Sequence, residues 1–100
     1  MKPYRVRYTP EAARYIRTLH PQVKQDVREA VKTLLETPLQ GHVLHHELSG
    51  YRSYRVRTYR VIYQLNEKDR TLDVIFVGPR RNVYEELLAL VRSPPLGTVE

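Results

Sequence analysis

The sequence predicts an α+β domain in the element order β-α-α-β-β-β-α, with about four strands in one antiparallel sheet. Near the N-terminus, arginines alternate with Val and Tyr, which is the period of a half-buried strand. Residues 23–35 repeat their apolar positions at helical spacing, and residues 54–77 return to strand-like segments. Two helices are therefore expected to lay one apolar stripe on a face of the sheet.

The N-terminal part is predicted to hold one strand and two helices. Residues 4–8 form the strand, and Thr9 can cap a helix over residues 10–19, with proline in its first position. The chain restarts as a second helix at Pro21, and this helix stops before Pro38. Its apolar face consists of Val23, Val27, Ala30, Val31, Leu34 and Leu35.

The rest of the chain is predicted to contain a loop, a meander of strands and a short helix. Residues 39–50 have the glycine and polar content of a long surface loop. Asn82 can cap a final helix that runs to about Val91, so one domain spans residues 1–92 and residues 93–100 form a mobile tail. The meander consists of residues 54–57, 59–65 and 71–77.

Composition limits the classes of function. Seventeen Lys and Arg against eleven Asp and Glu give a formal charge of +6, which favours a polyanionic partner such as nucleic acid. The absence of cysteine excludes disulfides, thiol nucleophiles and zinc-thiolate sites. The longest apolar run, residues 87–91, is far too short to span a bilayer, and no N-terminal signal segment is apparent. We therefore expect a soluble cytoplasmic protein without a membrane partner.

Arginines in the strand region predict an anion-binding site. Arg55 and Arg57 are two residues apart on a predicted strand, so both side chains should leave the same face of the sheet. A meander would bring Arg60 and Arg80 beside them, and converging guanidiniums repel one another unless an anion is bound. Tyr84, one turn into the last helix, is placed either to hydrogen-bond a substrate or to pack against the sheet edge.

Histidines in the predicted loop allow two interpretations. His42, His45 and His46 do not show the spacing of a zinc site, so neither a metal nor another cofactor is expected. An imidazole has a pKa suited to proton transfer near neutrality, which makes His42 or His46 a candidate general base. The alternative is an ordinary solvated loop histidine.

Two segments, HHELSGYRSYRVRTYRVIYQL and VGPRRNVYEEL, resemble the RelE/ParE superfamily of bacterial toxin–antitoxin toxins. The resemblance covers about residues 2–91, and the second segment favours the RelE-like branch. It implies a curved antiparallel sheet and a toxin that cuts mRNA in the ribosomal A site. It also implies metal-free cleavage through attack of the 2′-hydroxyl, and inhibition by a cognate antitoxin protein.

The resemblance also assigns roles to residues of this sequence. Arg55 and Arg57 fall where RelE-type toxins have strand lysines, and a guanidinium cannot serve as a general base as lysine can. Tyr84 or His42 is therefore the candidate base, and Arg52 and Arg81 are predicted to contact RNA. The predicted catalytic residues are Arg55, Arg57, Arg60, Arg80, Tyr84 and His42.

Two other functions remain open at the level of sequence. ParE-type members of the same superfamily inhibit DNA gyrase without cutting RNA. A degenerate toxin that only binds an antitoxin is the third possibility, because arginine replaces lysine at two positions. Joint retention of Arg60, Arg80 and Tyr84 favours the nuclease.

Overall fold

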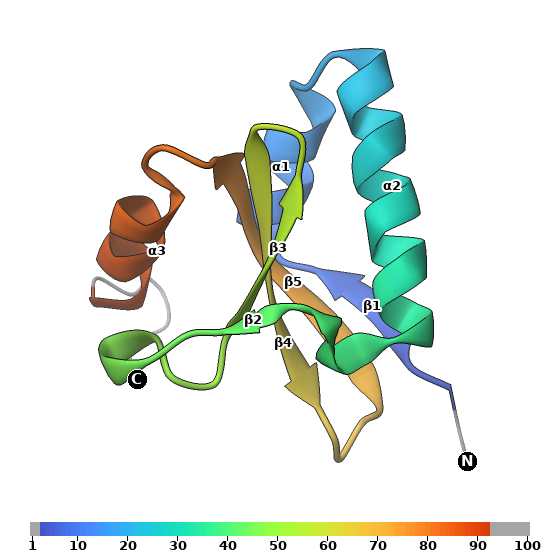
Figure 1. Cartoon of the computed structure of the whole chain (residues 1–100), viewed down its shortest axis with the longest axis vertical. Helices are drawn as coiled ribbons and strands as arrows, with labels where there is room; N and C mark the ends of the chain where they lie inside the picture. Colours follow the sequence, from blue (N-terminus) through green and yellow to red (C-terminus); the bar gives the residue numbers. More distant parts are fainter. Residues whose placement is uncertain (1–2, 93–100) are drawn as a thin grey trace.

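The computed structural model describes residues 3–92 and has the predicted order of elements (Figure 1). The predicted tail, residues 93–100, lies outside the described residues. The helices are α1 (Pro10–Arg17), α2 (Pro21–Glu36) and α3 (Val83–Arg92), with short 3₁₀ helices η1 (Pro38–Gln40) and η2 (His46–Leu48). The strands are β1 (Arg5–Tyr8), β2 (His42–Val43), β3 (Arg52–Val56), β4 (Tyr59–Asn66) and β5 (Thr71–Pro79).

The strands form one sheet in the order β1-β5-β4-β3-β2. The predicted meander is confirmed, because β3, β4 and β5 pair antiparallel in sequence order. The sheet also differs in two respects from the expected four antiparallel strands. The first strand pairs parallel to β5, and the segment 39–50 contributes a fifth strand of two residues. A strand this short cannot produce an alternating pattern, which is why the sequence indicated only a loop.

Local signals fix where the first two helices begin. Thr9 caps α1, since its Oγ1 accepts a hydrogen bond from the Ala12 N–H at 3.1 Å. Nδ1 of His20 accepts from the Gln22 N–H at 3.1 Å at the start of α2. Both helices carry proline in their first turn, where its missing N–H has no cost.

The sheet has an apolar cluster on each face, and helices from the two ends of the chain cover them. Figure 1 shows α1 and α2 on one side of the sheet and α3 on the other. On the α1 and α2 side, Leu34 and Tyr63 are fully buried in the larger cluster. On the opposite side, which we call the α3 face, Ile62 packs with Val83 and Leu87. In the described part of the chain, no helix is long and apolar enough to cross a membrane.

Candidate functional site

Polar side chains of three neighbouring strands meet on the α3 face. Residues directly opposite in an antiparallel pair point to the same face. His42 of β2 is opposite Ser53 of β3, and Arg55 of β3 is opposite Arg60 of β4. The period of two along β3 then places Ser53 and Arg55 on one side of the sheet. The strand register therefore groups an imidazole, a hydroxyl and two guanidiniums.

Ser53 joins this group to the last helix. The Tyr84 hydroxyl donates to Ser53 Oγ at 3.0 Å, and Arg60 Nη1 donates to the same oxygen at 3.3 Å. Ser53 has no exposed surface, so the serine hydroxyl is a buried acceptor shared by α3 and β4. Ser53 was not among the site residues predicted from the sequence. Its position two residues before Arg55 on the same strand was the signal that it would share the face.

The group borders a cavity of about 280 Å³ that also contacts Gln40 and Tyr54. Arg60 Nε is buried there and has no hydrogen-bond partner among the described residues. Within residues 3–92, neither Arg55 nor Arg60 forms an ion pair with a carboxylate. A half-buried Arg60 and an exposed Arg55, both without a carboxylate partner in the described chain, favour binding of an anion, and guanidinium geometry suits a phosphate. We call His42, Ser53, Arg55, Arg60 and Tyr84 the α3-face cluster.

Arg57 does not lie in the cluster, and the prediction that it shares a face with Arg55 is wrong. Strand β3 ends at Val56, and Arg57 has a φ of 56°, in the left-handed region. This turn directs its guanidinium to the opposite side of the sheet, where Nε donates to the Asp26 carboxylate of α2. The hydrogen bond from Arg57 lowers the pKa of Asp26. The alternation of side chains along β3 ends at Val56, one residue before Arg57, so it does not predict the side to which Arg57 points.

Arg52 and Tyr63 position the segment that leads into β2. Arg52 Nη1 donates to the carbonyl oxygens of Leu39 at 3.2 Å and Gly41 at 3.1 Å. The Tyr63 hydroxyl accepts from the Gly41 N–H at 2.9 Å and donates to the Pro38 carbonyl at 2.7 Å. Burial raises the pKa of Tyr63, which keeps this donor protonated. These bonds place His42 next to Ser53, and the RNA contact expected of Arg52 stays a prediction.

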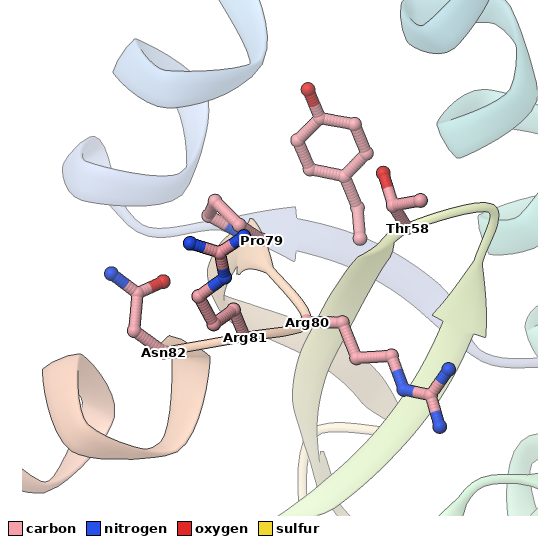
Figure 2. Close-up of a pocket in the computed structure, with 6 residues that line it drawn as sticks. Thr58, Pro79, Arg80, Arg81 and Asn82 are labelled. Atoms are coloured by element: carbon pink, nitrogen blue, oxygen red, sulfur yellow. The ribbon is translucent and has the colours of Figure 1, made fainter.

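Arg80 and Arg81 lie in the connection from β5 to α3. The Arg80 N–H donates to the Thr58 carbonyl at 2.7 Å, which ties this connection to the β3–β4 turn. Figure 2 shows the two guanidiniums pointing apart, with that of Arg80 directed toward the β3–β4 hairpin. Gly78 lies opposite Arg60, and the side chains of Phe76 and Val83 fill the space beside it, because a Cβ atom there would lie 3.0 Å from Phe76 and 3.3 Å from Val83. Of the four arginines expected to converge, Arg55 and Arg60 share the face and Arg80 lies at its end.

Asn82 precedes α3, but it does not cap the helix as predicted. The helix begins at Val83, as the sequence indicated. However, Asn82 Oδ1 is buried and has no hydrogen-bond partner among the described residues. An N-cap side chain accepts from an amide of the first turn, and this oxygen does not.

The loop histidines do not gather with other ligand side chains. Among residues 3–92, no three His, Cys, Asp or Glu side chains form a group that could hold a metal ion. His42 lies in β2, whereas His46 begins η2 and has a φ of 59°. The strand therefore separates His42 from its sequence neighbours and places it in the α3-face cluster.

Comparison with known proteins gives a consistent set of relatives. Residues 6–88 match the model of a family described as ParE-like toxin of type II bacterial toxin-antitoxin system. Toxin RelG of Mycobacterium tuberculosis is 36% identical over 84 residues, which cover 82% of this chain and 97% of RelG.

Solved structures agree with these sequence relatives. The toxin–antitoxin complex RelBE2 from M. tuberculosis matches with a TM-score of 0.72 and 36% identity, covering 79% of this chain and 100% of that one. A free mutant of the E. coli toxin RelE gives a TM-score of 0.75 over 91% of this chain and 98% of that one. Its identity is 21%, so this second likeness shows the fold alone.

Proposed function

The chain belongs to the ParE-like toxins of type II bacterial toxin–antitoxin systems, within the RelE/ParE superfamily, and from this premise we propose that it is a ribosome-dependent mRNA endoribonuclease. The observation that carries the proposal is the α3-face cluster. There, Tyr84 and Arg60 share the buried Ser53 hydroxyl beside Arg55 and His42. This arrangement combines groups that transfer protons with cations that bind phosphate.

In the proposed reaction, the 2′-hydroxyl of one nucleotide attacks the adjacent phosphorus and the bond to O5′ breaks. The products are a 2′,3′-cyclic phosphate and a 5′-hydroxyl end. Neutral His42 takes the proton from the 2′-hydroxyl, and the Tyr84 phenol, which is a donor in the structure, gives its proton to O5′. His42 gains one proton and Tyr84 loses one, so the number of protons on the two residues together is unchanged. Both return to their starting states when His42 releases a proton to water and Tyr84 takes one up.

The arginines supply the third requirement, which is stabilisation of charge on the pentacoordinate phosphorus. A guanidinium keeps its proton at any physiological pH, so Arg55 and Arg60 act as fixed cations rather than as bases. Arg80, at the end of the same face, is assigned to the leaving-group side of the phosphate. Preorganised cations in a partly buried cavity stabilise developing negative charge more strongly than cations in water do.

The proposed partners follow from the family and from charge. A relative with 36% identity was solved as a toxin–antitoxin complex, which supports a cognate antitoxin for this chain. The formal charge of +6 favours encounter with the ribosome and with mRNA in its A site. This reaction requires translating ribosomes, so we assign the protein to the cytoplasm.

Inhibition of DNA gyrase is the alternative function, because the matching family model is named after ParE. The two functions differ in what the arginine and tyrosine side chains do. A nuclease needs the Tyr84 hydroxyl and the Arg60 guanidinium for chemistry. A gyrase inhibitor needs only a surface that fits its protein target.

Primer extension on a translated reporter mRNA, after brief induction in cells, tests the proposal. Native protein should give cuts phased with codons, and Arg80→Ala together with Tyr84→Ala should give none. Arg57→Ala is the matched control, because it removes an arginine that lies outside the cluster. Growth arrest with intact mRNA would support the gyrase function, and intact mRNA without arrest would indicate a toxin that has lost its chemistry.

A further inference from the structure

A second and larger cavity, of about 620 Å³, opens at the end of the sheet near the cluster. Its lining comes from the β3–β4 turn and the β5–α3 connection, with Thr58, Tyr59, Pro79, Arg80, Arg81 and Asn82 (Figure 2). The Arg80 N–H bond to the Thr58 carbonyl joins these two walls at 2.7 Å. The cavity is within the size range of small-ligand pockets, about 300–1,000 Å³, and Arg80 is its one lining residue with a role in the reaction described above.

The chemistry of the lining fits a nucleobase. Asn82 lines the cavity, and its Oδ1 has no hydrogen-bond partner among the described residues, which is uncommon in a folded protein. Because this oxygen is buried, the Asn82 amide has to turn about its side-chain bonds to contact a ligand. Tyr59 supplies an aromatic ring that meets Tyr15 edge-on, at 6.5 Å between centroids, so these two rings do not stack on each other. Arg80 and Arg81 add positive charge, and no Asp or Glu of the described chain lines the cavity.

We propose that this cavity binds an unpaired adenine of the RNA next to the cleaved phosphate. The side-chain amide of asparagine matches the N6 amino group and N7 of adenine, because it offers one acceptor and one donor at the same spacing. An aromatic ring beside the base contributes stacking, as in other sites for single-stranded nucleic acid. Arg81 then pairs with a phosphate of the same strand. This inference rests on the proposed RNA substrate and adds a preference for one base.

The position of the cavity allows one RNA strand to reach both sites. Tyr59 and Arg60 are neighbours on β4, so their side chains leave opposite faces of the same strand. Arg80 and Arg81 are likewise neighbours whose guanidiniums point apart. A strand of RNA whose phosphate is held by Arg60 can therefore pass over the end of the sheet, with an adjacent base turned into the cavity.

Sequencing the 5′ ends of cut mRNA tests the base preference. Native protein should show adenine enriched at one position within about two nucleotides of the cut, and Asn82→Ala should lower that enrichment about 5-fold, the typical effect of one net hydrogen bond. Gln25→Ala, which removes an amide on α2, is the matched control and should leave the distribution unchanged. The same base distribution with native protein and Asn82→Ala would overturn the proposal.

A binding measurement separates failure of the pocket from failure of the nuclease. Tyr84→Phe protein, which should not cut, is titrated into fluorescein-labelled hexaadenylate and hexauridylate without ribosomes. Tighter binding of hexaadenylate that disappears with Asn82→Ala supports the pocket even if native protein cuts no mRNA. Equal affinity for the two oligomers overturns the pocket even if native protein cuts.

Thermal unfolding provides the structural control. If Asn82 serves the ligand and not the fold, Asn82→Ala should leave the Tm unchanged or raise it, because the substitution removes a buried acceptor that has no partner. A lower Tm would show that Asn82 supports the start of α3, and that result would overturn its assignment to the pocket.

Discussion

The Tyr84 hydroxyl on α3 donates to Ser53 Oγ on β3 at 3.0 Å, and this bond joins the last helix to the strand next to the sheet edge. Because Arg60 Nη1 donates to the same oxygen, one buried serine sets the position of both a phenol and a guanidinium. The geometry of the proposed site thus depends on a residue that need not contact the substrate.

Tyr84→Phe should abolish most cleavage while leaving the fold intact. The substitution removes the proposed proton donor, and loss of a general acid or base typically lowers the rate about 100-fold or more. Tyr84 is 36% exposed, so removing its hydroxyl should change stability little. The measurement is the fraction of reporter mRNA cut after induction, with the Tm as the control. Cleavage at the native rate would remove Tyr84 from the mechanism.

Ser53→Ala should lower cleavage about 10-fold through the loss of positioning, because the Tyr84 and Arg60 donors lose their shared acceptor. Ser53→Thr retains the hydroxyl and should recover much of the activity. A purely structural role predicts instead that cleavage by the two variants follows their stability. Measuring both cleavage and Tm for each variant distinguishes these outcomes.

Arg55→Ala and Arg57→Ala test the corrected placement of the two arginines. Arg55 borders the cavity of the α3-face cluster, whereas Arg57 is bound to Asp26 on the other side of the sheet. Loss of Arg55 should therefore reduce cleavage about 10-fold or more, and loss of Arg57 should leave it near the native level. Equal losses for both variants would contradict this assignment, and the cleavage assay with matched expression decides it.

The fold was predictable from the sequence wherever an element repeated its pattern over several residues. Residues 23–35 show helical spacing, and they lie within α2. In contrast, β2 contains two residues and leaves no periodicity. The parallel pairing of β1 with β5 depends on the path of the chain through the two helices and back to the sheet. The alternation of residues within β1 does not indicate which strand lies beside it.

The site was predictable only as far as strand alternation held. Arg55 and Arg60 do lie together, because both are inside regular strands. The left-handed turn at Arg57 broke the alternation, and no glycine or asparagine at that position signalled it. Asn82 has the residue type of a helix cap, but its Oδ1 is buried without a hydrogen-bond partner among the described residues, and residue type alone does not reveal this.

Gly41→Ala should destabilise the protein by about 1–3 kcal/mol, because a Cβ atom there would lie 2.6 Å from the Tyr63 hydroxyl. Tyr63 cannot easily move away, since it is fully buried and bonded to the Pro38 carbonyl. The free energy of unfolding in urea measures the effect. Leu39→Ala, at a neighbouring side chain that is 67% exposed, is the control and should change it by no more than about 0.5 kcal/mol.

Stability should depend on pH through Asp73, whose pKa is lowered by the hydrogen bond from Arg7. Because the pKa of Asp73 is lower in the folded state, its carboxylate stabilises the protein at pH values above the unfolded-state pKa of 3.8. This contribution to stability is lost as the pH falls through the folded-state pKa. Asp73→Asn should therefore lower the urea midpoint at pH 7, and its deficit should shrink below pH 3.8. A deficit that is the same at every pH would contradict this. Glu85→Gln, on the exposed side of α3, is the matched control.

Affinity for single-stranded RNA should fall steeply with salt, and Arg80→Ala should reduce that dependence. Each phosphate contact contributes about 0.7 to the slope of log K against log salt concentration for a single strand. Loss of Arg80 should therefore lower the slope by about 0.7, while Arg57→Ala should leave it unchanged, because that guanidinium is bound to Asp26. Fluorescence anisotropy with labelled RNA, between about 50 and 200 mM KCl, gives the slopes. An unchanged slope for Arg80→Ala would place its side chain away from the RNA backbone.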